Sequence, residues 1–383
     1  MHYIRRRKNS STTSIHLVCA IVFVLFSFSW LFFFQQDLLA MAQHVLSGGI
    51  THYNRTIGAI VLTVILFLLQ LGVYSITRLY GRAHALTYGP SLLFLGVLSD
   101  VTENNGGFVM HETSWWLIGF LVIVWVLAVL LARVLQEVEN DKKVGIMSRV
   151  MWINMLIMAV LMMLVPWIGN TNAVFHYRMK AEQCLIDGDV DGALETGRKS
   201  LESDEHLLMI RMYALARKGE LGEHLFEYPI TGNSSQMLPT DSLSCMMLYP
   251  TDSLYKFLGA RPASRMTPVR YLQLLQRRDS VPNKTVSDYL LCGELIDRDL
   301  DHFVKDLGRY YHINDSLPKH YREALTLYTH LRSKPVVVYH NTVMDEDYDN
   351  LQELERQYPL KSERKGKVEE HYRGTYWYYY RYE

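Results

Sequence analysis

The 383-residue sequence has few cysteines, no excess charge of either sign and none of the common catalytic motifs. Four cysteines are too few for a disulfide scaffold, and 39 basic against 39 acidic residues is not the basic excess typical of a nucleic-acid-binding protein. The patterns GxSxG, GxxxxGK[ST], HExxH and CxxC are absent. We therefore expect no nucleic-acid partner, no metal site and no cofactor, and a function that is not enzymatic.

Long apolar runs occur only in the first half of the chain. A bilayer core about 30 Å thick needs roughly 20 apolar residues in a helix, and four runs reach about that length: residues 16–34, 57–76, 115–132 and 150–168. A fifth run, residues 86–98, is shorter and contains Gly89-Pro90. We predict an all-α chain with three parts: a basic N-terminus (1–15), a transmembrane bundle of about five spans (16–168) and a soluble domain (169–383).

The distribution of basic residues favours five spans over four. Lys and Arg are enriched in short cytoplasmic loops. With five spans and the N-terminus inside, ten Lys and Arg residues lie inside and only Arg55 lies outside, whereas four spans place six inside and five outside. The domain after residue 168 is therefore predicted to be extracytoplasmic. A cleaved signal peptide is the alternative for the first run, although its apolar core is longer than the usual length of about 7–15 residues.

Beyond residue 170, apolar residues recur at helical spacing. Gly188 separates two short helical segments whose small residues Ala181 and Ala193 permit close packing, a pattern that resembles a tetratricopeptide repeat. Gly219 holds the corresponding place in a second unit. We predict a helical-repeat domain, with a compact irregular helical domain as the alternative. We expect the aromatic segment 375–383 to pack onto this domain, the alternative being contact with the bilayer or a partner.

One set of candidate functional residues follows from the repeat pattern. The first helix of each pair lines a concave groove in such repeats, and spacing places Arg178, Glu182, Tyr213 and Arg217 on those helices. Charged and aromatic side chains of this kind anchor protein interfaces. We therefore predict that these four residues bind a protein or peptide, the alternative being that they are solvated helix surface.

A second set lies in the predicted external loops, and Asp37 is its most prominent member, followed by His44. This second set supports an alternative function, an integral-membrane enzyme or carrier for a lipid-linked or envelope substrate, in which Asp37→Ala abolishes activity. Inside the spans, Gln70 and Asn154 are the only carboxamides, and no ionisable residue lies mid-span, which disfavours an ion-coupled carrier. The full set is Asp37, His44, His52, Asp100, Glu103, His111 and Glu112.

Three segments carry a resemblance to a known family: FFFQQDLLAMAQHVLSGGITHYNRTIGA (32–59), GNTNAVFHYRMKAEQCL (169–185) and LPKHYREALTLYTHLRS (317–333). They resemble a family of uncharacterised bacterial multi-pass membrane proteins with an external helical-repeat region. The resemblance implies this architecture and a bacterial inner-membrane location, and it transfers no catalytic residue. We predict a membrane-anchored envelope protein whose partners are the lipid bilayer and an envelope protein or peptide.

Overall fold

The computed structural model describes residues 10–104, 107–110, 113, 115–137, 148–239, 245–278 and 283–383. These residues form two compact units, unit 1 extending to Asn172 and unit 2 running from Ala173 to Glu383. The described residues are predominantly helical, which confirms the all-α prediction apart from one short hairpin. Of the predicted basic N-terminus, residues 1–9 lie outside the described residues.

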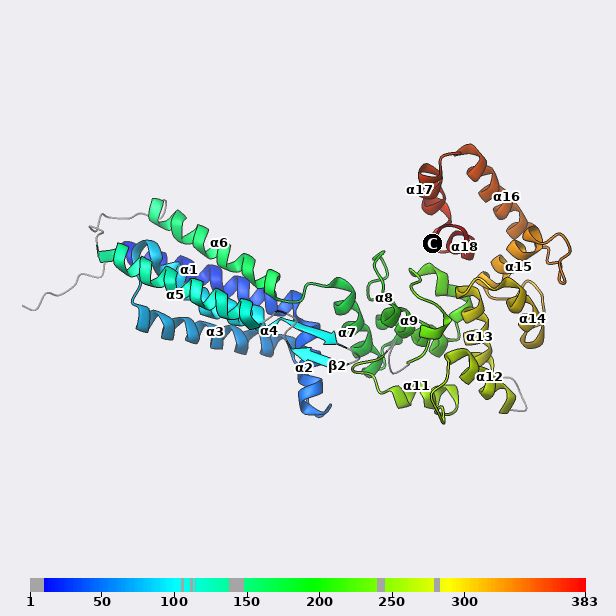
Figure 1. Ribbon diagram of the computed structural model, residues 1–383, viewed down its shortest axis with the longest axis horizontal. Coiled ribbons are helices and arrows are strands. Elements are labelled where there is room, and N and C mark those ends of the chain that lie inside the picture. Colours follow the sequence, from blue (N-terminus) through cyan, green and yellow to red (C-terminus); the bar gives the residue numbers. More distant parts are fainter. Residues whose placement is uncertain are drawn as a thin grey trace, which may run out of the picture. The chain divides into compact units, whose positions relative to one another are not determined.

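Unit 1 contains four helices that are long and apolar enough to cross a membrane. The first, Thr13–Phe34, combines α1 (Ser10–Ser29) with one π-helical stretch, η1 (Trp30–Phe34). The others are α3 (Arg55–Thr77), α5 (Trp115–Glu137) and α6 (Arg149–Ile168), all visible as long rods in Figure 1. These helices coincide with four of the predicted runs, and most of their exposed large side chains are apolar, as a lipid environment requires.

Side chains from neighbouring segments complete the ends of α3. The Asn54 side chain accepts hydrogen bonds from the first backbone N–H groups of the helix. At the other end, the Arg133 guanidinium of α5 donates to the carbonyl oxygens of Thr77 (3.1 Å) and Ile76 (2.7 Å). The last carbonyls of a helix have no partner within the helix, so this contact both satisfies them and joins α3 to α5.

The fifth apolar run, predicted as a span at residues 86–98, is divided between two helical types. The 3₁₀ helix η2 (Gly81–Tyr88) continues into α4 (Gly89–Leu98), which packs against α3 and α6. Gly89 permits the close approach of α5, because a Cβ atom at this position would lie 2.5 Å from the Trp125 ring. The Trp125 indole N–H also donates to the Leu86 carbonyl oxygen (2.8 Å).

The remaining elements of unit 1 connect the long helices along the chain. They are α2 (Gln36–Ser47) and an antiparallel hairpin of β1 (Val101–Asn104) and β2 (Gly107–Met110), which the sequence analysis did not predict. Polar contacts connect this end of the unit: the Trp30 indole N–H donates to the Ser99 hydroxyl (2.9 Å), and the Gln35 amide donates to the Asn170 carbonyl (3.0 Å). These contacts fix the end of the first span beside the start of the hairpin.

Unit 2 consists of helices packed around its own apolar core. The first half contains α7 (Ala173–Ile186), α8 (Val190–Glu195), α9 (Glu205–Lys218), α10 (Leu221–His224), η3 (Leu225–Glu227), η4 (Ser234–Gln236) and α11 (Thr251–Leu258). The second half contains α12 (Pro268–Arg278), α13 (Lys284–Ile296), α14 (Leu300–Tyr310), α15 (Lys319–Leu331), α16 (Thr342–Gln357), α17 (Lys361–Tyr372) and α18 (Tyr376–Tyr382).

The predicted turns of the repeat pattern are present, whereas the helices after them are short. Gly188 and Gly219 have φ values of +79° and +71°, which other residues rarely adopt. Ala181 and Ala193 are buried where α7 meets α8. However, α8 has six residues and α10 has four, because the chain turns again at Gly197 (φ +64°) and after His224. The tetratricopeptide-like repeat therefore stays a prediction.

The aromatic C-terminal segment packs onto its own unit, which confirms that prediction. Tyr376, Trp377, Tyr378 and Tyr379 are all buried. The Phe226 ring lies 5.0 Å, between centroids, from the rings of both Tyr376 and Tyr379. Figure 1 shows α15, α16, α17 and α18 following one another around a bend at this end of unit 2. The segment thus closes the core between η3 and α15.

Two carboxyl groups meet between α13 and α14. Burial, reinforced by the charge of Asp306, raises the pKa of Glu294 to about 9 from an ordinary value of 4.5. A folded-state pKa above the unfolded value means that the folded protein binds the proton more tightly, so stability falls as the pH rises from about 4.5 to about 9. We expect Glu294→Gln to flatten this fall, so that the variant exceeds the wild type in stability at pH 8 but not at pH 4.

Urea midpoints measured by circular dichroism on the full-length protein across this pH range test the prediction. Glu346→Gln is the matched control, because Glu346 is an exposed residue of α16. Parallel pH profiles for the wild type and Glu294→Gln would contradict the prediction.

Candidate functional site: a basic hollow in unit 2

The four residues predicted to line a groove are mostly buried. Arg178, Glu182 and Tyr213 are at most 4% exposed, and only Arg217 is exposed to solvent. The Arg217 guanidinium lies 5.9 Å from the centre of the Tyr213 ring, so these two residues are neighbours. The structure therefore gives three of the four residues an internal position and leaves only Arg217 exposed.

Glu182 acts as an anchor for the chain's own backbone. Its carboxylate accepts hydrogen bonds from the N–H groups of Met247 (3.2 Å), Leu248 (2.6 Å) and Tyr249 (2.9 Å). Burial raises the pKa of Glu182, and these three donors oppose the rise. The Tyr249 hydroxyl in turn lies 2.9 Å from that of Tyr213. The two predicted groove residues thus hold the 245–249 segment against α7 and α9.

Asp37 and His44, the first two residues of the second predicted set, do not lie next to each other. Asp37 is in the first turn of α2 and His44 is in its last turn, which separates them by two helical turns, about 10 Å along the axis. His52 is exposed and Asp100 is buried. His111 and Glu112 lie outside the described residues, as does the side chain of Glu103. The role of Asp37 stays a prediction.

A pair of stacked histidines in unit 1 was missed by the sequence analysis. The rings of His16 and His84 lie 3.7 Å apart, between centroids, and are nearly parallel. Tyr74 presents its edge to both rings. His84 is buried and precedes the predicted fifth span, whereas His16 begins the predicted first span. Spacing along the sequence gives no signal that these two side chains meet.

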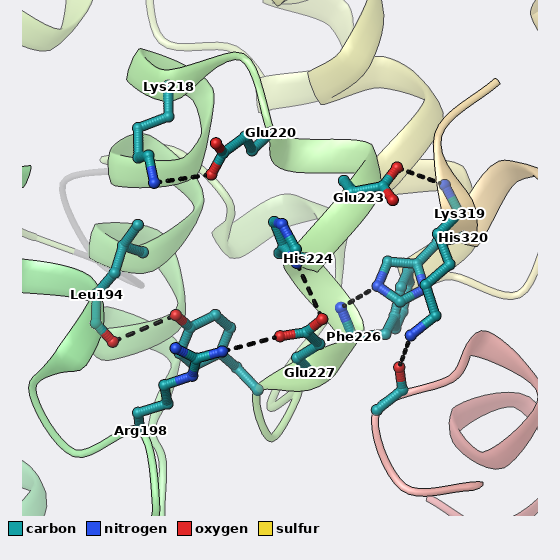
Figure 2. Close-up of polar contacts among 12 residues, drawn as sticks. Leu194, Arg198, Lys218, Glu220, Glu223, His224, Phe226, Glu227, Lys319 and His320 are labelled. Carbon is teal, nitrogen blue, oxygen red and sulfur yellow. Dashed lines mark hydrogen bonds and ion pairs between the residues drawn. The ribbon is translucent and has the colours of Figure 1, made fainter. Parts of the chain in front are cut away.

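A surface hollow of about 310 Å³ in unit 2 gathers several basic side chains, and we call it the basic hollow. Figure 2 shows part of it, with Arg198 and Glu227 on one side and Lys319 on the other. Its lining comes from the turn after α8, the end of η3, the start of α15 and the turn between α17 and α18. The lining residues are Arg198, Lys199, Glu227, Lys319, Arg373 and Gly374.

One wall of the basic hollow is an ion-pair network. Arg198 contacts the carboxylates of Glu195 (2.7 Å) and Glu227 (3.3 Å). Glu227 also accepts a hydrogen bond from His224 (2.9 Å). Burial raises the pKa of Glu227, but the His224 hydrogen bond and the nearby charges, among them Lys319, outweigh burial and the pKa is lowered. Glu227 therefore remains a carboxylate, and Arg198 is held in place by two acids.

The opposite wall is formed by Lys319, the first residue of α15. Its backbone N–H donates to the Glu223 carboxylate (2.7 Å), and its ammonium donates to the Gly374 carbonyl oxygen (3.1 Å). Gly374 has φ +85°, a conformation that favours glycine, and this turn brings its carbonyl to Lys319. Lys319 thus links α10, α15 and the segment that leads into α18.

Behind this wall, His320 and Glu323 are buried and already bonded. The Phe226 backbone N–H donates to His320 Nε2 (3.2 Å), so the imidazole proton is assigned to Nδ1, which donates to Glu323 (2.9 Å). The same carboxylate oxygen accepts the Tyr376 N–H (2.7 Å). A histidine whose acceptor nitrogen already accepts a backbone N–H cannot serve as a general base. The His320–Glu323 pair therefore has a structural role.

A second hollow, of about 420 Å³, shares Lys319 with the basic hollow. We call it the α15–α18 hollow. Its lining mixes apolar and polar side chains: Lys319, Glu323, Met344, Asp347, Asn350, Leu354, His371, Tyr372, Thr375 and Trp377. Within the described residues, no group of three or more His, Cys, Asp or Glu side chains is arranged to hold a metal ion.

Comparisons with known proteins bear on the second half of unit 2. Residues 263–383 match a family of unknown function (DUF6057). This region runs from just before α12 to the end of α18 and includes Lys319 and Arg373, but not Arg198 or Lys199. No curated protein and no solved structure matches the chain. The match assigns no activity to the basic hollow.

Proposed function

We propose that this protein is anchored in the inner membrane of a bacterium and presents unit 2 in the periplasm, where unit 2 binds a protein or peptide partner. Four apolar helices of membrane length support the membrane anchor. The N-terminus-inside orientation is supported by the basic residues before the first span and between the later ones.

A fifth span made of η2 and α4 is part of the proposal. Eight residues of 3₁₀ helix rise about 16 Å and ten residues of α-helix about 15 Å, and together they match a bilayer core of about 30 Å. The backbone is helical through the junction at Tyr88 and Gly89, which supports one continuous rod. An odd number of spans places the N-terminus and unit 2 on opposite sides of the membrane.

The observation that carries the partner-binding proposal is the basic hollow. Four basic side chains from three separate segments meet there on the surface of unit 2. The adjacent α15–α18 hollow adds Met344 and Leu354, which offer apolar contact beside the charged site. Binding is favoured over catalysis because His320 and Glu323, the nearest buried acid–base pair, are occupied by backbone N–H groups.

Site-specific photo-crosslinking in intact cells tests the proposal. A photoreactive amino acid at Lys199, in the basic hollow, is expected to give a discrete adduct that depends on irradiation. The same amino acid at Lys305, an exposed residue of α14, is the matched control and is expected to give none. Equal labelling at both positions, or none at Lys199, would overturn the partner-binding proposal.

Sidedness is measured separately in the same cells. An engineered cysteine at the exposed position Lys365, in a chain whose native cysteines are replaced, is expected to react with a thiol reagent that does not cross the inner membrane. Reaction only after lysis would place unit 2 in the cytoplasm.

A further inference from the structure

The basic hollow has four cations, and the protein itself pairs two of them. Arg198 pairs with Glu195 and Glu227, and the Lys319 ammonium lies 3.9 Å from the Glu323 carboxylate. No hydrogen bond or ion pair engages the other two side chains, those of Lys199 and Arg373, within the described part of unit 2.

The cations are held in place by different elements. Arg198 is fixed by Glu195 and Glu227, and the Lys319 ammonium rests on the Gly374 carbonyl oxygen. Lys319 also begins the 13-residue helix α15, and the Glu223 carboxylate caps this end of the helix by accepting the Lys319 N–H. Two oriented cations together with two unpaired ones provide donors from several directions around one small volume.

We propose that the basic hollow is a binding site for a phosphate group, either free phosphate or the phosphate monoester of a larger molecule. A carboxylate would cancel one of the two unpaired charges, whereas a phosphate monoester carries about 1.5 to 2 negative charges and three strong acceptor oxygens. Guanidinium groups bind such oxygens in pairs, and lysines contribute point charges. The phosphate comes either from a soluble molecule or from a lipid headgroup. This inference does not depend on the proposed protein partner.

The test uses the full-length protein purified in detergent, with inorganic phosphate as the probe and acetate at matched ionic strength as the reference. Calorimetric titration is expected to show saturable binding of phosphate and none of acetate. Arg373→Gln and Lys199→Gln are each expected to weaken phosphate binding about tenfold, because each removes a charged hydrogen-bond donor. Arg270→Gln and Lys305→Gln, matched exposed residues outside the hollow, are expected to leave the affinity unchanged.

Two further arms identify the source of the phosphate. Flotation with vesicles of phosphatidic acid in phosphatidylcholine reports a lipid headgroup, and titration with glycerol phosphate reports a soluble monoester. Binding in either arm that is lost in Arg373→Gln supports the proposal.

Several results would overturn it: equal affinity for acetate and phosphate, Gln variants in the hollow that bind like the matched controls, or tighter binding of a glutamate-rich peptide than of any phosphate compound. The last result would assign the hollow to an acidic peptide. All four substituted residues are exposed, and a circular dichroism spectrum confirms that each variant is folded.

Discussion

Replacing Glu323 by alanine is expected to lower the free energy of unfolding of unit 2 by about 2–5 kcal/mol. The Glu323 carboxylate is 2% exposed and accepts hydrogen bonds from His320 Nδ1 and from the Tyr376 N–H. Alanine leaves both donors buried without an acceptor. Because the Tyr376 bond joins α15 to the first residue of α18, the loss is expected to release the aromatic segment from the core.

Hydrogen exchange measured by mass spectrometry on the full-length protein checks this prediction through the protection of residues 376–382. The protection of α18 in Glu323→Gln is expected to lie between that of the wild type and that of the alanine variant, because the glutamine amide oxygen still accepts one hydrogen bond. Glu353→Ala is the matched control, because the Glu353–Arg356 pair is exposed and such pairs contribute less than about 1 kcal/mol. Unchanged protection of α18 in Glu323→Ala would contradict the anchoring role.

In unit 1, the largest effect is expected from Asn154→Ala, with a loss of about 1–3 kcal/mol. Asn154 is fully buried on α6, and its amide nitrogen donates to the carbonyl oxygens of Gly81 (2.8 Å) and Val150 (2.9 Å). Its oxygen accepts the Ala85 N–H (2.8 Å). One side chain thus ties α6 to η2, and apolar surroundings offer the freed groups no substitute partner.

Thermal stability in detergent, followed by size-exclusion chromatography, measures this loss, and hydrogen exchange over residues 81–88 locates it. Met163→Ala, a lipid-facing change on the same helix, is the matched control and is expected to have little effect. Similar melting temperatures for the two variants would show that the Asn154 contacts do not hold η2.

Features that depend on residues close together in the sequence were predictable. Four apolar runs correspond to the four membrane-length helices, because length and hydropathy alone decide whether a helix suits a bilayer. Gly188 and Gly219 mark turns because they adopt positive φ values, which other residues rarely do. The burial of the aromatic segment at residues 376–379 also follows from its composition.

Features that depend on the packing of distant segments were not predictable. Helical periodicity places Glu182 on one face of α7 but does not reveal that residues 247–249 cover that face. The stacking of His16 on His84 depends on the path of η2, and the basic hollow depends on four segments without any shared spacing. In each case the decisive neighbour is remote along the chain.

The wide separation of these neighbours sets an order of events during synthesis. Phe226 meets His320 across 94 positions, and Glu323 meets Tyr376 across another 53. Contacts this remote form slowly and only after both partners have been made. A nascent chain that has emerged as far as α14 therefore exposes Phe226 and its apolar surroundings, and is a substrate for chaperones or proteases until α18 arrives. The basic hollow, which needs both Arg198 and Arg373, is likewise completed only after the whole of unit 2 has been made.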